Sequence, residues 1–160
     1  MISAAVAGST PSLVRVLVLH GPNLNMFGVR EPNIYGSVRL SEINETMRKL
    51  GTTLDVEIRD DQSNHEGHLI DRLQAAGRGV EEGVVFNPGA LAHYSYALHD
   101  AVKAIRIPVV EVHVSDISKR EKWRKKSVIA PACIRQISGR GIDSYLEGLR
   151  HVVGRIRGER

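Results

Sequence analysis

Short apolar runs alternate with amphipathic segments along most of the chain, and this alternation limits the possible folds more than any other feature. The apolar runs have the length of β-strands and lie at residues 14–19, 53–59, 83–87, 107–114 and 133–138. Segments with apolar residues at helical spacing lie at residues 41–51, 63–77, 92–105 and 141–156. Strands that alternate with helices, without a long linker or an internal repeat, are typical of one parallel sheet with right-handed crossovers.

Residues at the ends of the helical segments support this assignment. Ser41 is the expected N-cap of the first helix, and Gly51 is its expected end. Ser63 and Glu66 have the spacing of a capping box at the start of the second helix. The pattern therefore predicts an α/β fold with a flavodoxin-like, doubly wound sheet of five parallel strands in a single domain.

A chain of 160 residues normally forms one domain. We expect it to cover residues 14–156, between a flexible leader at 1–13 and a short tail at 157–160. The leader lacks the basic start of a secretory signal, and no apolar run approaches the ~18–20 residues of a membrane span. The single cysteine, Cys133, excludes an internal disulfide and is expected to be a packing residue. These features predict a cytoplasmic protein without a membrane partner.

The net charge of +4 and the pI near 9.5 are compatible with binding to nucleic acid or to an anionic small molecule. Aromatic residues are few, and they are not interleaved with basic residues as in nucleic-acid-binding surfaces. The densest basic run, at residues 118–127, has the composition of a solvated face. The net positive charge and the few aromatic residues together favour a small anionic ligand over nucleic acid.

Polar clusters follow four of the expected strands. They read HGPNLN, DDQSNHE, NPGALAH and HVSDISKRE. Ligands bind at the carboxyl ends of the strands in open parallel sheets. These clusters therefore predict a polar pocket that accepts an anion, and an enzyme rather than a structural module.

Two known phosphate-binding motifs are absent. The chain has neither GxGxxG after the first strand nor GxxxxGK[ST], and it lacks the Ser/Thr-rich loop that an FMN-binding flavodoxin-like domain needs. His65 and His68 lie three residues apart but have no third metal ligand near them in the sequence. We therefore expect neither a cofactor nor a metal site.

The connection at residues 20–36 is much longer than the about 2–6 residues usual between a strand and a helix. It contains Arg30 and Tyr35 between two glycines, Gly28 and Gly36. We interpret the second half of this segment as a lid that carries these two side chains over a bound substrate.

Four ordered motifs resemble those of the type II 3-dehydroquinate dehydratases. They read GPNLN…G.REP.IYG, QSNHEG, NPGA..H.S.AL.DA and PVVEVH.S….RE..R..S, and the resemblance covers roughly residues 14–155. It implies a cofactor-free hydro-lyase that eliminates water from 3-dehydroquinate to give 3-dehydroshikimate through an enolate. The pathway implied is that of shikimate, for aromatic amino acid biosynthesis, or of quinate metabolism. The assembly implied is a homododecamer, a tetramer of trimers.

The resemblance also implies catalytic roles. Tyr35 matches the base; because a phenol is a poor base at neutral pH, it needs the nearby cation of Arg30. Asn23 matches the residue that positions a water at the enolate. His113 matches the general acid, and Glu111, two residues earlier on the same strand face, is placed to orient its imidazole.

Other matched positions belong to substrate binding. Asn87 and the start of the following helix are one part, and the backbone N–H groups after the fourth strand match a carboxylate cradle. Asp100 matches a residue that reaches the site of a neighbouring subunit, and Arg120 is expected to form a structural ion pair. The substrate-binding residues predicted in this way are Asn87, Gly89, Ala90, His93, Asp100, Val114, Ser115 and Arg124.

One alternative from another class stays open at this point, a catalytically weakened relative that binds a carboxylate metabolite as a sensor or assembly module. Several residues depart from the family pattern, foremost His20 in place of a usual Asn directly after the first strand. We expect His20 to affect hydrogen bonding of the loop or the response to pH. Asp116 also departs from the pattern, but neither change removes a proposed catalytic group.

Overall fold

A computed structural model describes residues 12–159. Most of the predicted leader and the last residue of the predicted tail therefore lie outside the described residues. Five parallel strands form one sheet in the order β2-β1-β3-β4-β5, which is the flavodoxin-like order and confirms the predicted fold. The strands are β1 (Val14–His20), β2 (Val56–Gln62), β3 (Gly83–Asn87), β4 (Val109–His113) and β5 (Arg135–Ser138).

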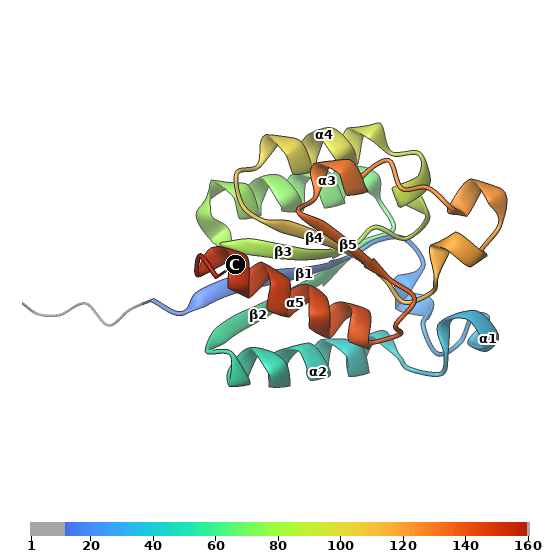
Figure 1. Cartoon of the computed structure of the whole chain (residues 1–160), viewed down its shortest axis with the longest axis horizontal. Coiled ribbons are helices and arrows are strands. Elements are labelled where there is room, and N and C mark those ends of the chain that lie inside the picture. Colours follow the sequence, from blue (N-terminus) through green and yellow to red (C-terminus); the bar gives the residue numbers. More distant parts are fainter. Residues whose placement is uncertain (1–11, 160) are drawn as a thin grey trace, which may run out of the picture.

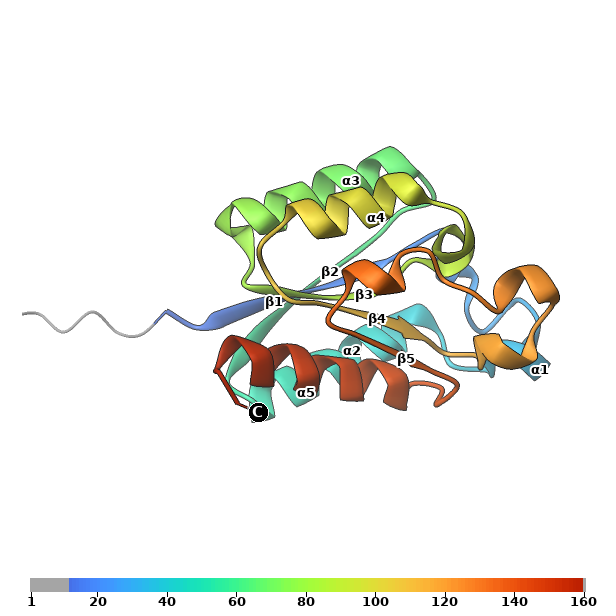
Figure 2. The same cartoon turned by 45° about the horizontal axis from the view of Figure 1, so that its top comes forward.

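Helices cover both faces of the sheet (Figures 1 and 2). α2 and α5 lie on one face, and α3 and α4 lie together on the other. A short helix, α1, lies beyond the sheet near the segment that follows β4. The helices are α1 (Pro32–Tyr35), α2 (Leu40–Thr53), α3 (Glu66–Ala75), α4 (Tyr96–Ala104) and α5 (Asp143–Ile156).

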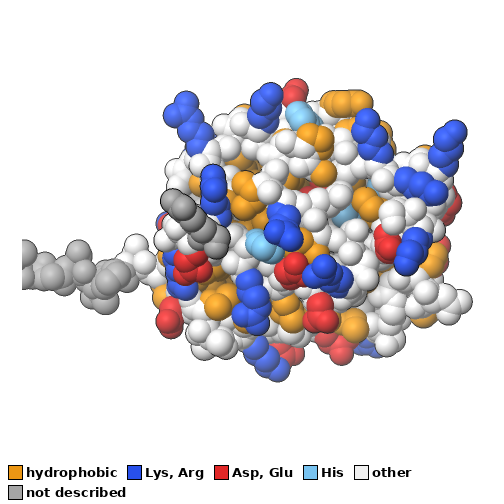
Figure 3. Space-filling view, in the orientation of Figure 1, with side chains coloured by type: hydrophobic (Ala, Val, Ile, Leu, Met, Phe, Trp, Pro, Cys, Tyr) orange, Lys and Arg blue, Asp and Glu red, His pale blue; other side chains and the backbone are white. Residues whose placement is uncertain are grey.

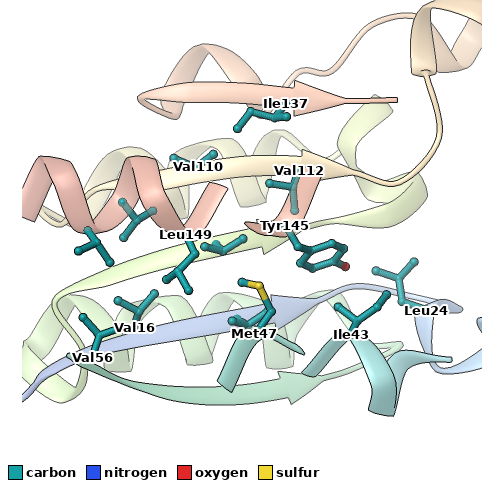
Figure 4. Close-up of a cluster of buried hydrophobic side chains, with 14 of the residues drawn as sticks. Val16, Leu24, Ile43, Met47, Val56, Val110, Val112, Ile137, Tyr145 and Leu149 are labelled. Carbon is teal, nitrogen blue, oxygen red and sulfur yellow. The ribbon is translucent and has the colours of Figure 1, made fainter. Parts of the chain in front are cut away.

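β1 is buried on both faces. Val16 and Val18 point into the core beneath α2 and α5, whereas Leu17 and Leu19 point into the core beneath α3 and α4. Alternating side chains of a strand point to opposite faces, so a continuous apolar run is what a central parallel strand requires. Figure 4 shows the first of these cores, where the ring of Tyr145 lies among aliphatic side chains.

The second strand begins later than its sequence predicts. The expected strand was 53–59, but α2 continues to Thr53, and Asp55 turns the chain with a positive φ of 54° before β2 starts at Val56. Gly51, the expected end of the helix, lies inside it. A Cβ at this position would come within 2.6 Å of the Ile58 side chain. This glycine permits close helix–strand packing rather than a helix stop.

Two predicted helix caps are also wrong. α2 begins at Leu40, one residue before the expected cap Ser41, and the Glu42 carboxylate accepts a hydrogen bond from the Arg39 N–H. The Ser63 hydroxyl accepts from the His65 N–H, before α3 begins, instead of forming a capping box. Local hydrogen bonds of this kind compete with caps and shift helix ends by a residue or two.

Most of the remaining predicted elements are shorter than expected, although β1 extends one residue further, to His20, and β3 has the expected bounds. α4 starts at Tyr96 instead of residue 92, because Ser95 caps it by accepting from the Leu98 N–H at 3.0 Å, and residues 89–93 form a separate 3-10 turn. Further 3-10 turns lie at Leu24–Met26, Ile117–Lys119, Lys122–Arg124 and Ala130–Ala132, and a wider turn at Ala76–Val80 extends α3.

No helix within residues 12–159 has the length and apolar character needed to cross a membrane. On the face shown in Figure 3, Lys and Arg side chains are scattered among acidic ones. Among the described residues, that face therefore carries no continuous basic patch.

Replacing Gly51 with alanine tests the close packing of α2 on β2. We expect G51A to destabilise the protein by about 1–3 kcal/mol, because the added methyl group forces the helix and strand apart. Gly67 is the matched control: it is an exposed helical glycine with open space around its Cβ direction. G67A should be neutral or stabilise by up to about 1 kcal/mol. Thermal unfolding of both variants measures the difference, and equal shifts would contradict the packing role.

Candidate active site

A pocket opens at the carboxyl ends of β1, β3 and β4. β1 and β3 are adjacent in the sheet, but their connections leave in opposite directions, which is the switch point where ligands bind in doubly wound folds. Register places His20 of β1 opposite Asn87 of β3, so the two strands end at the same level. The pocket is lined by Pro22, Asn23, Leu24, Phe27, Arg30, Tyr35, Asn87, Gly89, Ala90, His93, His113, Val114, Ser115, Ile117, Arg120 and Arg124.

The long segment after β1 carries two groups of this pocket. Asn23 has a positive φ of 67°, and its N–H donates to Asn64 Oδ1 at 2.9 Å, which ties the start of the segment to the loop after β2. Gly28 and Gly36 have φ values of 83° and 77°, a region that favours glycine. The two glycines thus turn the chain on either side of α1, whose last residue is Tyr35.

The hydroxyl of Tyr35 faces two guanidinium groups. Arg30 Nη2 lies 3.4 Å and Arg120 Nη1 3.2 Å from the phenol oxygen, and both guanidinium carbons lie near the ring, 4.7 and 5.3 Å from its centroid. Arg120 also donates to Ser115 Oγ at 3.1 Å, and Arg30 is held by Glu31 at 2.8 Å. Two positive charges therefore converge on one oxygen atom.

Arg120 lines the pocket although the sequence did not place it among the substrate-binding residues. A structural ion pair was expected, and the Arg120 Nε atom does lie 3.3 Å from Glu121 Oε2. The same side chain nevertheless reaches across to Tyr35, which is 85 residues away in the sequence. The sequence signal that could have placed Arg120 in the pocket is its position five residues after Ser115, in the segment that follows β4.

His113 is held from behind by a buried carboxylate. Its Nε2 atom lies 2.6 Å from Glu111 Oε1, and both side chains are almost fully buried. Glu111 also accepts hydrogen bonds from Ser127 Oγ at 2.8 Å and Gln136 Nε2 at 2.9 Å. Because these contacts fix the carboxylate and occupy Nε2, the Nδ1 atom of His113 is the ring nitrogen available to a ligand.

The part of the pocket next to His113 is built from the turn after β3 and the basic run, and the His93 and His113 rings stack with their centroids 6.4 Å apart. His93 Nδ1 lies 2.8 Å from the Lys126 carbonyl oxygen, and burial lowers the pKa of His93, which keeps the ring neutral at pH 7. The edge of Trp123 packs on His93, and the Arg124 guanidinium lies 3.9 Å from the Trp123 ring centroid. The aromatic ring thus holds both pocket residues.

Two predicted site residues do not line the pocket of this chain. Glu111 lies behind His113, as the orienting role requires. Asp100 is exposed on α4, outside the pocket, and its predicted role in a neighbouring subunit stays a prediction. The other predicted residues all line the pocket together.

Cys133 lies outside the pocket and behaves as a packing residue. It is half-buried, its Sγ lies 3.7 Å from the Ile129 carbonyl oxygen, and burial raises the pKa of its thiol. Within the described residues, no group of three or more His, Cys, Asp or Glu side chains is arranged to hold a metal ion.

His20 is fully buried between the sheet and the helices α2 and α5. Its Nδ1 lies 2.9 Å from the Tyr145 hydroxyl, and its Nε2 lies 2.8 Å from Asn44 Oδ1. Burial lowers the pKa of His20 from 6.5 to about 4, although the Asn44 contact and the charges of Asp60 and Asp61 oppose this shift. The ring is therefore neutral in the folded protein at pH 7.

The pKa of His20 predicts a stability change with pH. Between pH 6.5 and 4 the unfolded chain binds a proton at His20 that the folded protein does not, so acidification lowers the free energy of unfolding. The loss contributed by His20 is about 3 kcal/mol over this interval.

Thermal unfolding from pH 8 to pH 4 measures this contribution. H20Q should lack it and lose less stability on acidification than the wild type. The exposed His65 provides the control, because H65Q should follow the wild-type curve. A wild-type curve parallel to that of H20Q would contradict the neutral, buried state.

A family model described as dehydroquinase class II matches residues 14–153, and the chain belongs to this family. The match spans every strand and helix described above except the last turn of α5.

Similar proteins carry a consistent name. A 3-dehydroquinate dehydratase of Caldicellulosiruptor saccharolyticus is 50% identical over 143 residues, which cover 88% of this chain and 99% of the relative. One from Pelotomaculum thermopropionicum is 55% identical over 137 residues, covering 86% of this chain and 94% of the relative. The crystal structure of the type II dehydroquinase from Butyrivibrio crossotus superimposes with a TM-score of 0.86 at 39% identity, covering 88% of this chain and 98% of that one.

Proposed function

We propose that this protein is a type II 3-dehydroquinate dehydratase, a hydro-lyase that converts 3-dehydroquinate to 3-dehydroshikimate and water. Family membership supports the reaction, and the named relatives act on this substrate according to their names. The observation that carries the proposal is the Tyr35 hydroxyl between two guanidinium groups, in the same pocket as His113.

The first step is removal of the proton next to the substrate ketone. The phenolate of Tyr35 takes this proton, and the electron pair of the C–H bond moves into the enolate. Arg30 Nη2 and Arg120 Nη1 lie 3.4 and 3.2 Å from the phenol oxygen and hold it in place beside the substrate. Asn23, at the mouth of β1, positions the water that stabilises the enolate oxygen.

The second step is loss of the hydroxyl group. The enolate electrons form the ring double bond, the C–O bond breaks, and His113 supplies the proton that makes the leaving group water. Glu111 Oε1, 2.6 Å from His113 Nε2, holds the orientation of the imidazole. The proton taken by Tyr35 returns to His113 through solvent after product release, which completes the cycle.

The substrate carboxylate binds at the end of β4. Val114 and Ser115 line the pocket there and offer their backbone N–H groups to the carboxylate, and Asn87, at the end of β3, lines the same pocket. His93 and Arg124 contact the ring hydroxyls, with Gly89 and Ala90 forming the adjacent wall. A net charge of +4 also attracts a carboxylate substrate.

Assembly and location extend the proposal. The subunits form a homododecamer of four trimers, in which Asp100 on the outer surface of α4 reaches a neighbouring subunit's site. The enzyme works in the cytoplasm without a cofactor, in the shikimate pathway or in quinate metabolism. The alternative role as a catalytically weakened sensor finds no support in the pocket, because all the proposed catalytic groups are present.

The direct test is turnover of 3-dehydroquinate by the purified protein, followed by the ultraviolet absorbance of the conjugated product. We expect the wild type to be active without added metal. Tyr35→Phe should lose nearly all turnover, at least about 1,000-fold, and still bind product, because only the base is removed. A folded wild type without activity would refute the function, and an active Y35F variant would refute the base assignment.

Arg120→Ala tests the second guanidinium at Tyr35. We expect kcat to fall by roughly 100-fold, the scale of losing one charged group from a preorganised site. Lys125 is the matched control, an exposed cation of the same basic run outside the pocket. K125A should keep the wild-type rate, and an equal loss in both variants would point to the general charge of the run instead.

A further inference from the structure

A continuous chain of hydrogen bonds runs through the core from the outer strand of the sheet to the pocket. It begins at Asp60 of β2, passes through Asn44 and His20, and reaches Tyr145 of α5. The Tyr145 hydroxyl then contacts Asn87 Nδ2 at 2.9 Å, at the end of β3. Five polar side chains from three strands and two helices thus form one connected path.

The outer end of the chain fixes the protonation of His20. Asn44 Nδ2 donates a hydrogen bond to Asp60 Oδ2 at 2.9 Å, because a carboxylate oxygen can only accept. The Asn44 Oδ1 atom must therefore face His20. An amide oxygen only accepts hydrogen bonds, and Nε2 of His20 must therefore carry the proton. In the neutral ring Nδ1 is then a bare acceptor.

The hydrogen bonds at the pocket end are compatible with the same protonation of His20. Asn87 Oδ1 accepts from the backbone N–H of Gly89 at 3.1 Å, which turns Nδ2 towards Tyr145. The Tyr145 oxygen accepts this bond, and its own proton is free to go to His20 Nδ1 at 2.9 Å. Burial raises the pKa of Tyr145, so the hydroxyl keeps its proton. The Asn44 end therefore requires the Nε2–H tautomer of His20, and with this tautomer every partner at the Tyr145 end is satisfied.

We infer that His20 is a positioning residue that acts through Tyr145 to fix the side-chain amide of Asn87 in one orientation at the substrate pocket. An amide flip of Asn87 would set its oxygen against Tyr145, whose proton is already committed to His20, and would leave its NH2 group against the Gly89 N–H. This role rests on the proposed function, in which Asn87 binds substrate, and it deepens that function by adding a residue outside the pocket.

Burial makes the arrangement strict. His20, Tyr145 and Asn87 are each at most 2% exposed. Unpaired polar groups at such depth are costly, so this path of hydrogen bonds is most stable when every donor meets an acceptor. Figure 4 shows Tyr145 with its hydroxyl at the end of the ring facing Leu24, which is a lining residue of the pocket.

The test compares Tyr145→Phe with Ser144→Ala. Y145F removes the hydroxyl that joins His20 to Asn87 and leaves the ring in the core. Ser144 is the preceding residue of α5 and is fully buried, and its hydroxyl accepts a hydrogen bond from the Arg140 N–H, which is not part of this hydrogen-bond path. Each variant therefore loses one buried hydroxyl from the same helix.

For Y145F we expect kcat/KM for 3-dehydroquinate to fall roughly tenfold, mainly through KM, whereas S144A keeps the wild-type value. In an Asn87→Ala background the effect of Y145F should vanish, because the positioned group is gone. A fall that S144A shares, or one that persists in the Asn87→Ala background, would overturn the inference.

Nuclear magnetic resonance of the ligand-free protein tests the positioning without any activity. We expect the His20 ring to carry its proton on Nε2, and the Asn87 side-chain amide signals to shift in Y145F but not in S144A. A proton on Nδ1, or unchanged Asn87 signals in Y145F, would overturn the inference. A wild type that fails to turn over 3-dehydroquinate yet shows these signals would refute the proposed function alone.

Discussion

The pairing of β1 with β2 on one side and β3 on the other is the constraint on which the rest of the structure depends. This pairing places the ends of all three strands at one level, with His20 opposite both Gln62 and Asn87. The chain leaves β1 and β3 in opposite directions, so a pocket opens between their connections. Every catalytic residue proposed here lies on a strand near its carboxyl end or on the segment that follows a strand.

The charged side chains of the pocket form two groups at the carboxyl ends of the strands. Arg30 arrives from the segment after β1 and Arg120 from the segment after β4, and both reach the one phenol of Tyr35. On the far side, a buried carboxylate, Glu111, faces His113. The proposed base thus has two cationic neighbours, and the proposed acid has one anionic neighbour.

Much of the site could be predicted from the sequence because polar motifs follow apolar strands, and parallel strands bring their ends together. The position of Arg120 could not, since its contact with Tyr35 spans 85 residues and depends on how two loops fold over one another. The start of β2 was misplaced for a related reason. Gly51 resembles a helix stop in the sequence, but close packing against Ile58 is what requires a glycine there.

The sequence alone determined the α/β class, the five-stranded parallel sheet and the family, because these depend on periodic burial and on motifs that are local in the chain. Only the tertiary structure decided how His20 is used. Its partners Asn44 and Tyr145 lie 24 and 125 residues away, on helices that pack against the same face of the sheet. Hydrogen-bond direction depends on which atoms meet in space, and no local pattern records that.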